Sequence, residues 1–563
     1  MGNSKNKKRD KGLNTLLFLL SFLIIFAVTP FLREGFFKIH DQTHFERLFE
    51  LDRSLKLGGV PARIAPDLYF GYGYPIFNFY GSGSYYLAEI FYMMGFGLVS
   101  SIKLVFVISV LAGSLGMYLL TNKFFGKEAG ILAGVLYVFT PYRAVNLYIR
   151  GALTESLALA IVPWVIFFLV SYVEKKKVSF LILSSFFYAF LVLSHNISGV
   201  VFSVFYVLGL GGYLILKKKS LADGFYLMLP IVFGLAMSSF FWVPALYEKS
   251  WVATESMTRG ILDFHLHYPK IKALFYSVWQ YGGSGANFGI SSKDMSFQVG
   301  IINLILVGGS IVFVLGQFKR WRDNLVAIFG LVFFGVSLFL ITSKSVFLWE
   351  RLPLISYLQF PWRFLGWTTF FSCFLGGFFV WKMKGKNIAA IILVVAVVVL
   401  NISYFKPEEY FEIDESIYTV ERINGETTGV TDEYLPGWAK VGKEKSLEGI
   451  IKSDGSKIKI DSLNSNYFRT EFDYKASEQI KVGLDYLYYP DFKVYQEDGV
   501  IEAGYNEKSG LVEFELPEGE GRVIVLFQET MLRESVNVLS FLTMAFGVML
   551  LIRFLLKEKS ERR

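Results

Sequence analysis

The sequence has a single cysteine, Cys373, and this residue lies inside an apolar run. An intrachain disulfide and a cysteine-based metal site are therefore excluded. Charge is also scarce, because Asp, Glu, Lys and Arg make up 18% of the 563 residues while hydrophobic residues make up 53%. This balance is too apolar for an ordinary soluble protein of this size and indicates a chain with many membrane-spanning helices.

Ionisable residues are almost absent from the middle of the long apolar runs. A charge at the bilayer centre costs about 2.5 to 3.5 kcal/mol on insertion scales, so no charged pathway is expected to cross the membrane. The formal net charge of +8 comes from Lys and Arg clusters in short segments between the apolar runs. Such clusters are typical of topology signals and argue against nucleic-acid binding.

Apolar segments of roughly 17 to 22 residues are long enough to cross a bilayer as helices, and the sequence predicts about twelve. They lie at residues 13–31, 102–122, 129–142, 155–173, 178–195, 199–216, 224–244, 299–318, 324–342, 364–382, 387–404 and 533–556. The first follows a basic tail at 1–12. We interpret it as a retained signal anchor, because Val28-Thr29-Pro30 is not a small-x-small cleavage site.

The positively charged clusters fall on alternate loops. They lie at residues 5–11, 123–127, 175–177, 217–219, 319–322, 382–386 and in the basic tail 557–563. The positive-inside rule makes this side cytoplasmic, so both termini are predicted to lie in the cytoplasm. The chain itself is predicted to lie in the plasma (inner) membrane. The long segments then face outward: 32–101, 143–154, 245–298, 343–363 and 405–532.

The sequence thus predicts a transmembrane domain over residues 13–404 with a large outer loop at 32–101. In this loop, residues 42–56 have helical spacing, with Asp41 as a candidate N-cap and Gly58-Gly59 as a stop. The glycine-rich aromatic stretch 69–86 is expected to lie against the membrane surface, before an interfacial helix at 85–98. Residues 405–532 alternate with period two between turn signals, which predicts an extracytoplasmic β-sandwich-like domain that the last span, 533–556, holds at the membrane.

Asp41 is the first candidate for chemistry. A carboxylate held just above the bilayer suits a general base that takes a proton from an attacking hydroxyl. The alternative is a helix N-cap with no chemical role, and the two are compatible. His40 and His44 extend the candidate site. Together with Asp41 they could hold a divalent metal, and the alternative is that they are polar histidines of the membrane interface.

A second group of candidates lies in the segment PYRAVNLYIRGALTES, which carries Arg143, Arg150 and Glu155. Guanidinium groups in a short outer loop between two spans can contact a phosphate or pyrophosphate bidentately. Lipid-headgroup contact or a plain Arg-Glu pair would explain them equally well. His195, at the outer end of a predicted span, either faces the same cavity or is an ordinary interfacial histidine.

The segment QFPWRF places Arg363 among aromatic residues directly before a span. As a functional residue, Arg363 would hold a lipid phosphate while Trp362 shapes an acyl groove. As a structural residue, it would be a snorkelling arginine in an aromatic belt.

Together these segments resemble the bacterial and archaeal membrane proteins called 6-pyruvoyl-tetrahydropterin synthase-related. The resemblance rests on the first outer loop (HDQTHFERLFELDRSLKLGGVPARI and GYGYPIFNFYGSGSYYL), on PYRAVNLYIRGALTESLALAIVPW and LSHN, and most specifically on QFPWRFLG. It covers about residues 13–404, and nothing here looks like a soluble pterin enzyme. The architecture is similar to the GT-C glycosyltransferase superfamily.

This resemblance implies a membrane glycosyltransferase of GT-C type that moves a sugar from a polyprenyl-phosphate donor to an extracytoplasmic glycan, lipid or protein acceptor with inversion. Asp41 matches the catalytic acid of the first outer loop. Many relatives carry a second acid beside it, whereas here its neighbours are His40 and Gln42. Two alternatives remain: a lipid-linked glycan transporter or flippase, which should carry polar groups through the midplane, and a non-catalytic glycan-binding scaffold at the surface.

Overall fold

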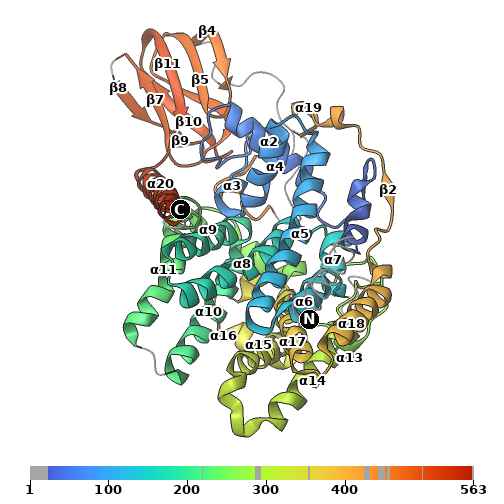
Figure 1. Cartoon of the computed structure of the whole chain (residues 1–563). Coiled ribbons are helices and arrows are strands. Elements are labelled where there is room, and N and C mark those ends of the chain that lie inside the picture. The colour runs from blue at the N-terminus through green and yellow to red at the C-terminus, as the bar shows by residue number, and fades with distance from the viewer. Residues whose placement is uncertain are drawn as a thin grey trace.

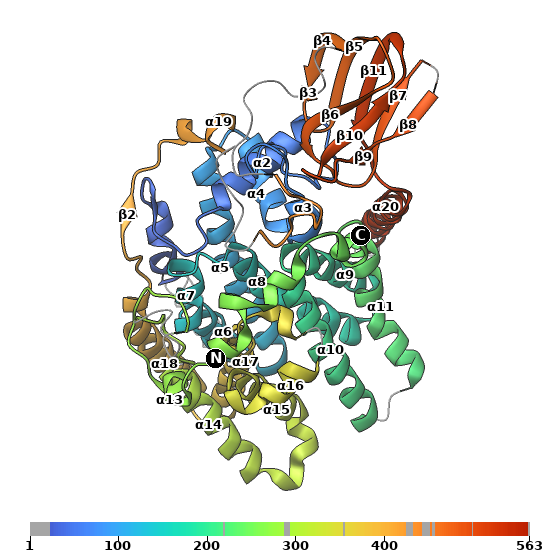
Figure 2. The ribbon, with the colours of Figure 1, turned by 180° about the vertical axis from the view of Figure 1, so that it is seen from behind.

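The computed structural model describes residues 23–217, 220–285, 293–352, 355–423, 432–441, 451–452, 457–497 and 499–560. A large helical body carries a β region at one end, and helix α20 (Met531–Ser560) connects this region to the helices (Figure 1). Seen from behind, the β region again projects from one end of the helical body (Figure 2).

Helices form at the predicted apolar segments of the described chain. They are α5 (Leu98–Phe125), α6 (Lys127–Val138), α8 (Leu153–Lys175), α9 (Val178–Ser194), α10 (Asn196–Leu216), α11 (Leu221–Met237), α12 (Ser239–Tyr247), α14 (Ile301–Gly316), α15 (Leu325–Ile341), α17 (Leu365–Lys382), α18 (Lys386–Asn401) and α20. Within the described residues, seven helices are long and apolar enough to cross a membrane, or eight if the pair α11 and α12, bent by 72°, is one span.

Among the described residues, the other predicted spans contain helices that are shorter than a full crossing. An apolar helix covers Leu23–Leu32, and most of the predicted span 13–31 lies outside the described residues. The prediction at 129–142 is wrong as one span, because α6 ends at Val138 and a separate helix α7 (Pro141–Tyr148) follows. Pro141 explains the break, since it begins α7 at the first helical position and leaves Thr140 extended. Residues 143–148, predicted as loop, are therefore helical and buried.

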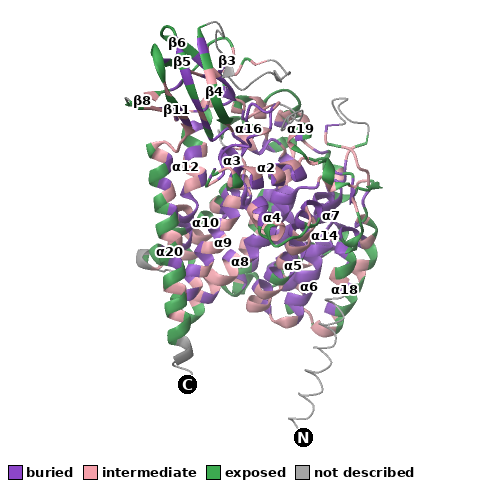
Figure 3. Cartoon of the chain, turned by 90° about the horizontal axis from the view of Figure 1, so that it is seen from above, coloured by how far each residue is buried: buried purple, intermediate pink, exposed green. Residues whose placement is uncertain are grey.

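Burial separates an inner from an outer set of helices. Figure 3 shows buried residues concentrated on α5, α6 and α8, whereas α18 and α20 carry long exposed faces. These faces are apolar, with Val399 and Phe541 about two-thirds exposed. In water such a surface would be unfavourable, so the outer helices are suited to contact with lipid.

The first outer loop folds into three helices, α2 (His44–Lys56), α3 (Ile76–Phe79) and α4 (Gly83–Met93). Helix α2 matches the prediction and is followed by Gly58 with φ +97°. The predicted N-cap is wrong, because Thr43 occupies this position and makes no side-chain cap. Asp41 lies two residues earlier, outside the helix.

The aromatic stretch 69–86 is packed inside the protein, which corrects its predicted place at the membrane surface. Most of its rings are buried, and Tyr72 accepts a backbone hydrogen bond from Leu487 of the β region. Gly73, with φ +88°, makes this packing possible, because a Cβ there would lie 2.2 Å from the ring of Tyr467.

The β region contains two antiparallel sheets. One has the order β3-β6-β10-β9 and the other β4-β5-β11-β7-β8. The strands are β3 (Ile451–Lys452), β4 (Ile458–Ser465), β5 (Arg469–Ala476), β6 (Ile480–Leu487), β7 (Phe492–Gln496), β8 (Gly499–Glu502), β9 (Gly504–Tyr505), β10 (Leu511–Leu516) and β11 (Gly519–Phe527). Buried and exposed residues alternate along β5, as the period-two pattern predicts.

The chain before these strands lies along the helical body. Strand β2 (Tyr410–Phe411) pairs with β1 (Phe36–Phe37), and Val252 forms a β-bridge with Pro436. Among the described residues, the two sheets of the β region therefore begin at β3, well after residue 405, the start of the predicted β domain.

A buried polar network joins the β region to the helices. Glu248 accepts two hydrogen bonds from Arg533, at 2.8 and 2.9 Å, one from Asn78 at 2.7 Å and one from Tyr489 at 2.8 Å. These residues come from the start of α20, the first outer loop and the β region. Since burying either charge alone would be costly, the network fixes how these parts meet.

Candidate functional site

Backbone hydrogen bonds bring Asp41 to the turn between α7 and α8. His40 N donates to Ile149 O at 2.9 Å, and Asp41 N donates to Arg150 O at 3.0 Å. The first outer loop is thus joined to the segment that carries the predicted phosphate-binding residues. The side chain of Asp41 remains 33% exposed.

The carboxylate of Asp41 has positively charged and hydroxyl neighbours. Thr43 Oγ1 donates to Oδ1 at 3.1 Å, and Arg47 Nη1 lies 3.4 Å from Oδ2. Burial raises the pKa of Asp41, but the charge of Arg47 and the hydrogen bond from the Thr43 hydroxyl outweigh it and hold this pKa below the usual value. Asp41 is therefore a carboxylate at neutral pH.

His44 is fully buried and has both ring nitrogens engaged. Its Nε2 donates to Gly151 O at 2.5 Å, because a carbonyl oxygen can only accept. Its Nδ1 then accepts from the Tyr85 hydroxyl at 2.8 Å, which fits a neutral ring. Burial is the main reason that the pKa of His44 lies below its ordinary value.

The suggested metal site is not assembled. His40 directs Nε2 to Tyr281 O at 2.9 Å, and both nitrogens of His44 are occupied. Among the residues that the structure describes, no group of three or more His, Cys, Asp and Glu side chains is placed to hold an ion. His44 instead helps to fix the position of the Asp41 segment.

Glu155, in the first turn of α8, is the centre of a second cluster. Its Oε1 accepts from Tyr142 at 2.6 Å and from Asn146 at 3.2 Å, while its Oε2 accepts from Arg150 Nη1 at 2.8 Å. Helix α7 presents Tyr142 and Asn146 on the same face, four residues apart.

Arg363 completes this cluster but is held less tightly. Its Nη1 donates to Leu358 O at 2.8 Å, and its Nε lies 3.8 Å from Oε2 of Glu155. Within the described chain, this buried Nε has no hydrogen-bond partner. The side chain is 17% exposed, so it retains the capacity to bind an anion. The neighbouring Trp362 supports the Arg150 guanidinium, which lies 4.6 Å from the ring centroid.

Tyr80 connects the two clusters, and the sequence analysis missed it as a site residue. Its ring lies under the Arg47 guanidinium at 4.7 Å, and its hydroxyl is 3.3 Å from Thr154 Oγ1. The result is one continuous site with three arginines, Arg47, Arg150 and Arg363, and two carboxylates. Arg47 was also missed, although a charged residue on the apolar face of a helix was a usable signal.

Arg143 and His195, two further predicted residues, differ in their relation to the cluster. Arg143 is buried inside the helical body, where it donates to Ser156 O at 3.1 Å and Ser109 O at 3.2 Å. It holds α5 and α8 together and does not face the other arginines. His195 lies between α9 and α10, where its side chain accepts from Ser198 N as the N-cap of α10. It also lies within electrostatic range of Glu155, Arg363 and Arg150, so it borders the arginine cluster.

An apolar cavity of about 450 Å³ lies between α8, α10, α15 and α17. Its lining includes Phe202, Phe205 and Trp367, and it extends to Glu174 near the end of α8. Trp367 is one helical turn after Arg363, so the lining of the cavity begins one turn from the arginine cluster.

A family model described as 6-pyruvoyl-tetrahydropterin synthase related domain, a membrane protein, matches residues 77–408, more than half of the chain. An uncharacterized protein of Lactococcus lactis subsp. cremoris (strain MG1363) is 26% identical over 258 residues, which are 43% of this chain and 42% of that protein. The chain thus matches less than half the length of this relative.

Two solved structures match this chain at low identity. ArnT from Cupriavidus metallidurans bound to undecaprenyl phosphate is 16% identical, with 68% of this chain and 64% of that chain covered and a TM-score of 0.40. The archaeal oligosaccharyltransferase AglB from Archaeoglobus fulgidus, in complex with an inhibitory peptide and a dolichol-phosphate, is 12% identical, with 71% and 56% covered and a TM-score of 0.41.

The family match includes α4 to α18, and with them Tyr80, Glu155 and Arg363 of the site. It leaves Asp41 and the β region outside. The apolar helices and this match together identify the chain as a membrane protein that belongs to the 6-pyruvoyl-tetrahydropterin synthase-related family.

Proposed function

We propose that this protein is a membrane glycosyltransferase that moves a sugar from a polyprenyl-phosphate-linked donor to an acceptor outside the cytoplasm. The observation that carries the proposal is the continuous site at the end of apolar helices, in which an ionised, partly exposed Asp41 pairs with Arg47 while Arg150 and Arg363 gather around Glu155. Such a site combines a proton acceptor with groups that bind a phosphate leaving group.

The arginines support the phosphate part of the proposal. Arg47 is paired with Asp41 and Arg150 with Glu155, so the clustered side chains have one more cation than anions. Arg363 is the arginine with the weakest pairing, since its contact with Glu155 is 3.8 Å long. A phosphate oxygen would complete its hydrogen bonding and balance its charge.

The apolar cavity supports a lipid-linked donor. Its lining begins one turn from Arg363 and continues between α8, α10, α15 and α17. A molecule with a phosphate head and a long hydrocarbon tail matches this pairing of a cationic end with an apolar channel. A water-soluble nucleotide sugar would leave the cavity unused.

Asp41 would act as the general base. Its carboxylate accepts the proton of the acceptor hydroxyl as the hydroxyl oxygen bonds to the anomeric carbon, while the bond from that carbon to the phosphate oxygen breaks. Arg363 and Arg150 stabilise the negative charge that develops on the leaving phosphate. A single displacement of this kind inverts the anomeric configuration. We place the site outside the cytoplasm and both termini inside, on the distribution of Lys and Arg between loops.

The proposal is tested by the surface glycans of the native host. A strain without this protein is complemented with wild type, with Asp41→Asn, and with Asp67→Asn as a matched control. Asp67 also pairs with an arginine of the first outer loop, at 2.9 Å from Arg53. We expect a glycan component that is missing from the deletion strain to return with wild type and Asp67→Asn only.

A different result would select another function. If Asp41→Asn restores the component at equal membrane abundance, Asp41 is no base, and a scaffold that binds glycan explains the site better. If the deletion strain instead accumulates a lipid-linked glycan on the cytoplasmic side, the protein is a transporter.

A further inference from the structure

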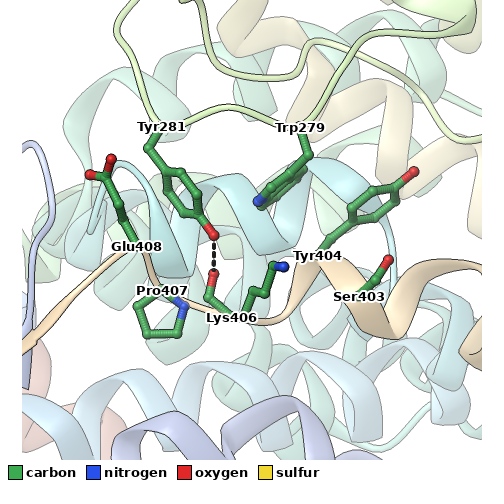
Figure 4. Close-up of a pocket in the computed structure, with 7 residues that line it drawn as sticks. All are labelled: Trp279, Tyr281, Ser403, Tyr404, Lys406, Pro407 and Glu408. Carbon is green, nitrogen blue, oxygen red and sulfur yellow. Dashed lines mark hydrogen bonds between the residues drawn. The ribbon is translucent and has the colours of Figure 1, made fainter.

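A second hollow, of about 460 Å³, opens at the end of α18 (Figure 4), and none of its lining residues belongs to the arginine cluster. Trp279 and Tyr281 reach down to it from one segment, and Tyr404 and Lys406 reach it from the chain after α18. Nothing in the proposed mechanism uses this hollow. Its volume lies in the range of small-molecule sites.

Aromatic rings form two walls of the hollow. Trp279 and Tyr404 are stacked, with ring centroids 4.8 Å apart and planes 22° from parallel. Tyr281 stands at 85° to Trp279, with centroids 6.4 Å apart. An aromatic platform with a perpendicular side wall suits a flat ligand that has apolar C–H faces and a polar edge.

Polar groups of both kinds surround these rings. Lys406 supplies donors and Glu408 supplies acceptors, while Ser403 has a hydroxyl that can do either. The buried Trp279 Nε1 points toward Tyr281 without completing a hydrogen bond of ordinary geometry. This mixture matches the hydroxyl groups of a neutral sugar, and the forked cations that distinguish the phosphate site are missing from the lining described here.

The hollow is tied to the segment that carries Asp41. His40 Nε2 donates to Tyr281 O at 2.9 Å, and Lys38 lies 3.3 Å from Glu408. Lys38 N also donates to Glu409 O at 3.0 Å, next to the pairing of β1 with β2. One short stretch of backbone therefore supports both the wall of the hollow and the carboxylate.

We propose that this hollow is a saccharide-binding subsite that holds a neutral pyranose ring of the acceptor glycan while another part of the glycan reaches Asp41. The sugar ring lies on the Trp279–Tyr404 platform, and Lys406 and Glu408 bond its hydroxyls. This proposal rests on the proposed transferase function for the identity of the ligand as an acceptor. Binding of saccharide at the hollow is a separate property and is measured separately.

The experiment uses the full-length protein in lipid nanodiscs and a panel of neutral trisaccharides built from hexoses and N-acetylhexosamines. Saturation-transfer difference NMR reports binding to wild type, Trp279→Ala and Tyr276→Ala. Tyr276 is the matched control, since it is a highly exposed aromatic residue of the same segment and does not line the hollow. We expect Trp279→Ala to weaken binding about tenfold and Tyr276→Ala to bind like wild type.

Each possible result either supports or rejects the saccharide-binding subsite. Equal binding by wild type and Trp279→Ala, or no binding of any panel member by wild type, would overturn the subsite. If Trp279→Ala only lowers the yield of protein in the membrane, as Tyr276→Ala does too, the rings serve as an interfacial anchor and the subsite is rejected. If saccharide binding depends on Trp279 while Asp41→Asn still restores the host glycan, the subsite stands and the proposed role of Asp41 fails.

Discussion

The buried pair of Arg533 and Glu248 should hold the β region and α20 in place on the helical body. Both side chains are fully enclosed, at 0% and 1% exposed, and two hydrogen bonds at 2.8 and 2.9 Å join them. Removing one partner leaves the other charge buried without its counter-ion, which costs about 3 to 5 kcal/mol. Arg533→Met and Glu248→Met should each lose this amount.

The double variant should cost less than either single one. With both charges gone, no buried ion remains uncompensated. Asn78 and Tyr489 each still lose a bond to Glu248, which costs about 1 to 3 kcal/mol in total. Lys475→Met is the control, since its pair with Glu520 is about three-quarters exposed on both sides and should contribute only about 0 to 1 kcal/mol.

The loss of stability is measured by the rate at which a protease cleaves the β region of the full-length protein in nanodiscs. When opening is fast relative to cleavage, the cleavage rate follows the population of the open form. We expect the single variants to be cleaved about 10² to 10⁴ times faster than wild type, and the double variant more slowly than either. Additive effects of the two substitutions would refute the argument, because they would mean that the two side chains do not interact.

Three further predictions concern other parts of the molecule. Arg363→Ala should weaken binding of a polyprenyl phosphate about 10- to 100-fold, and Arg363→Lys, which keeps the charge but loses the forked guanidinium, should have an intermediate affinity. Native mass spectrometry of the lipid-bound protein measures both affinities, and unchanged binding by Arg363→Ala would remove the residue from the phosphate site. Gly73→Ala should loosen the contact between the first outer loop and the β region, because its Cβ would meet Tyr467 at 2.2 Å and its φ is +88°. We expect faster proteolysis of the β region, and a variant as resistant to protease as wild type would contradict this prediction. Burial, with a contribution from Asp52, raises the pKa of Glu89 from 4.5 to about 7. The folded state therefore holds this proton more tightly than the unfolded state, and stability should fall as the pH rises from about 4.5 to about 7. Glu89→Gln should unfold at a higher temperature than wild type at pH 8 but not at pH 4, and an equal difference at both pH values would contradict this prediction.

Much of the helical body could be predicted because hydrophobic length is a local property. Segments such as 153–175 and 365–382 are apolar over a full crossing and are helices in the structure. The break at Thr140-Pro141 was available in the sequence, but the apolar run over 129–142 concealed it. Helix α2 was predictable from its spacing, whereas its cap depended on the backbone pairing of Asp41 with Arg150, a contact between distant residues.

The residues of the site differ in how well the sequence could place them. The sequence places Arg150, Glu155 and Arg363 at the outer ends of apolar runs, and therefore at a similar depth in the membrane. In the structure these three residues lie together. Arg143 is seven residues before Arg150 and looked equivalent. It lies on α7, however, and donates to carbonyl groups inside the helical body, whereas Arg150 follows the end of α7. Tyr80 and Arg47 join the site only through the fold of the first outer loop, and no spacing in the sequence encodes their contact. The pair of Arg533 and Glu248 was missed for the same reason.

The central claim is that the ionised Asp41 removes the acceptor proton during transfer, and turnover of a lipid-linked sugar tests it most directly. Wild type, Asp41→Asn and Asp67→Asn are reconstituted in proteoliposomes with lipid-linked sugars extracted from the deletion strain and with the acceptor from its envelope. The account predicts that wild type and Asp67→Asn consume the lipid-linked sugar and form an inverted linkage, while Asp41→Asn is slower by about 10² to 10⁴ with unchanged binding of polyprenyl phosphate. Turnover by Asp41→Asn at the wild-type rate would contradict the account.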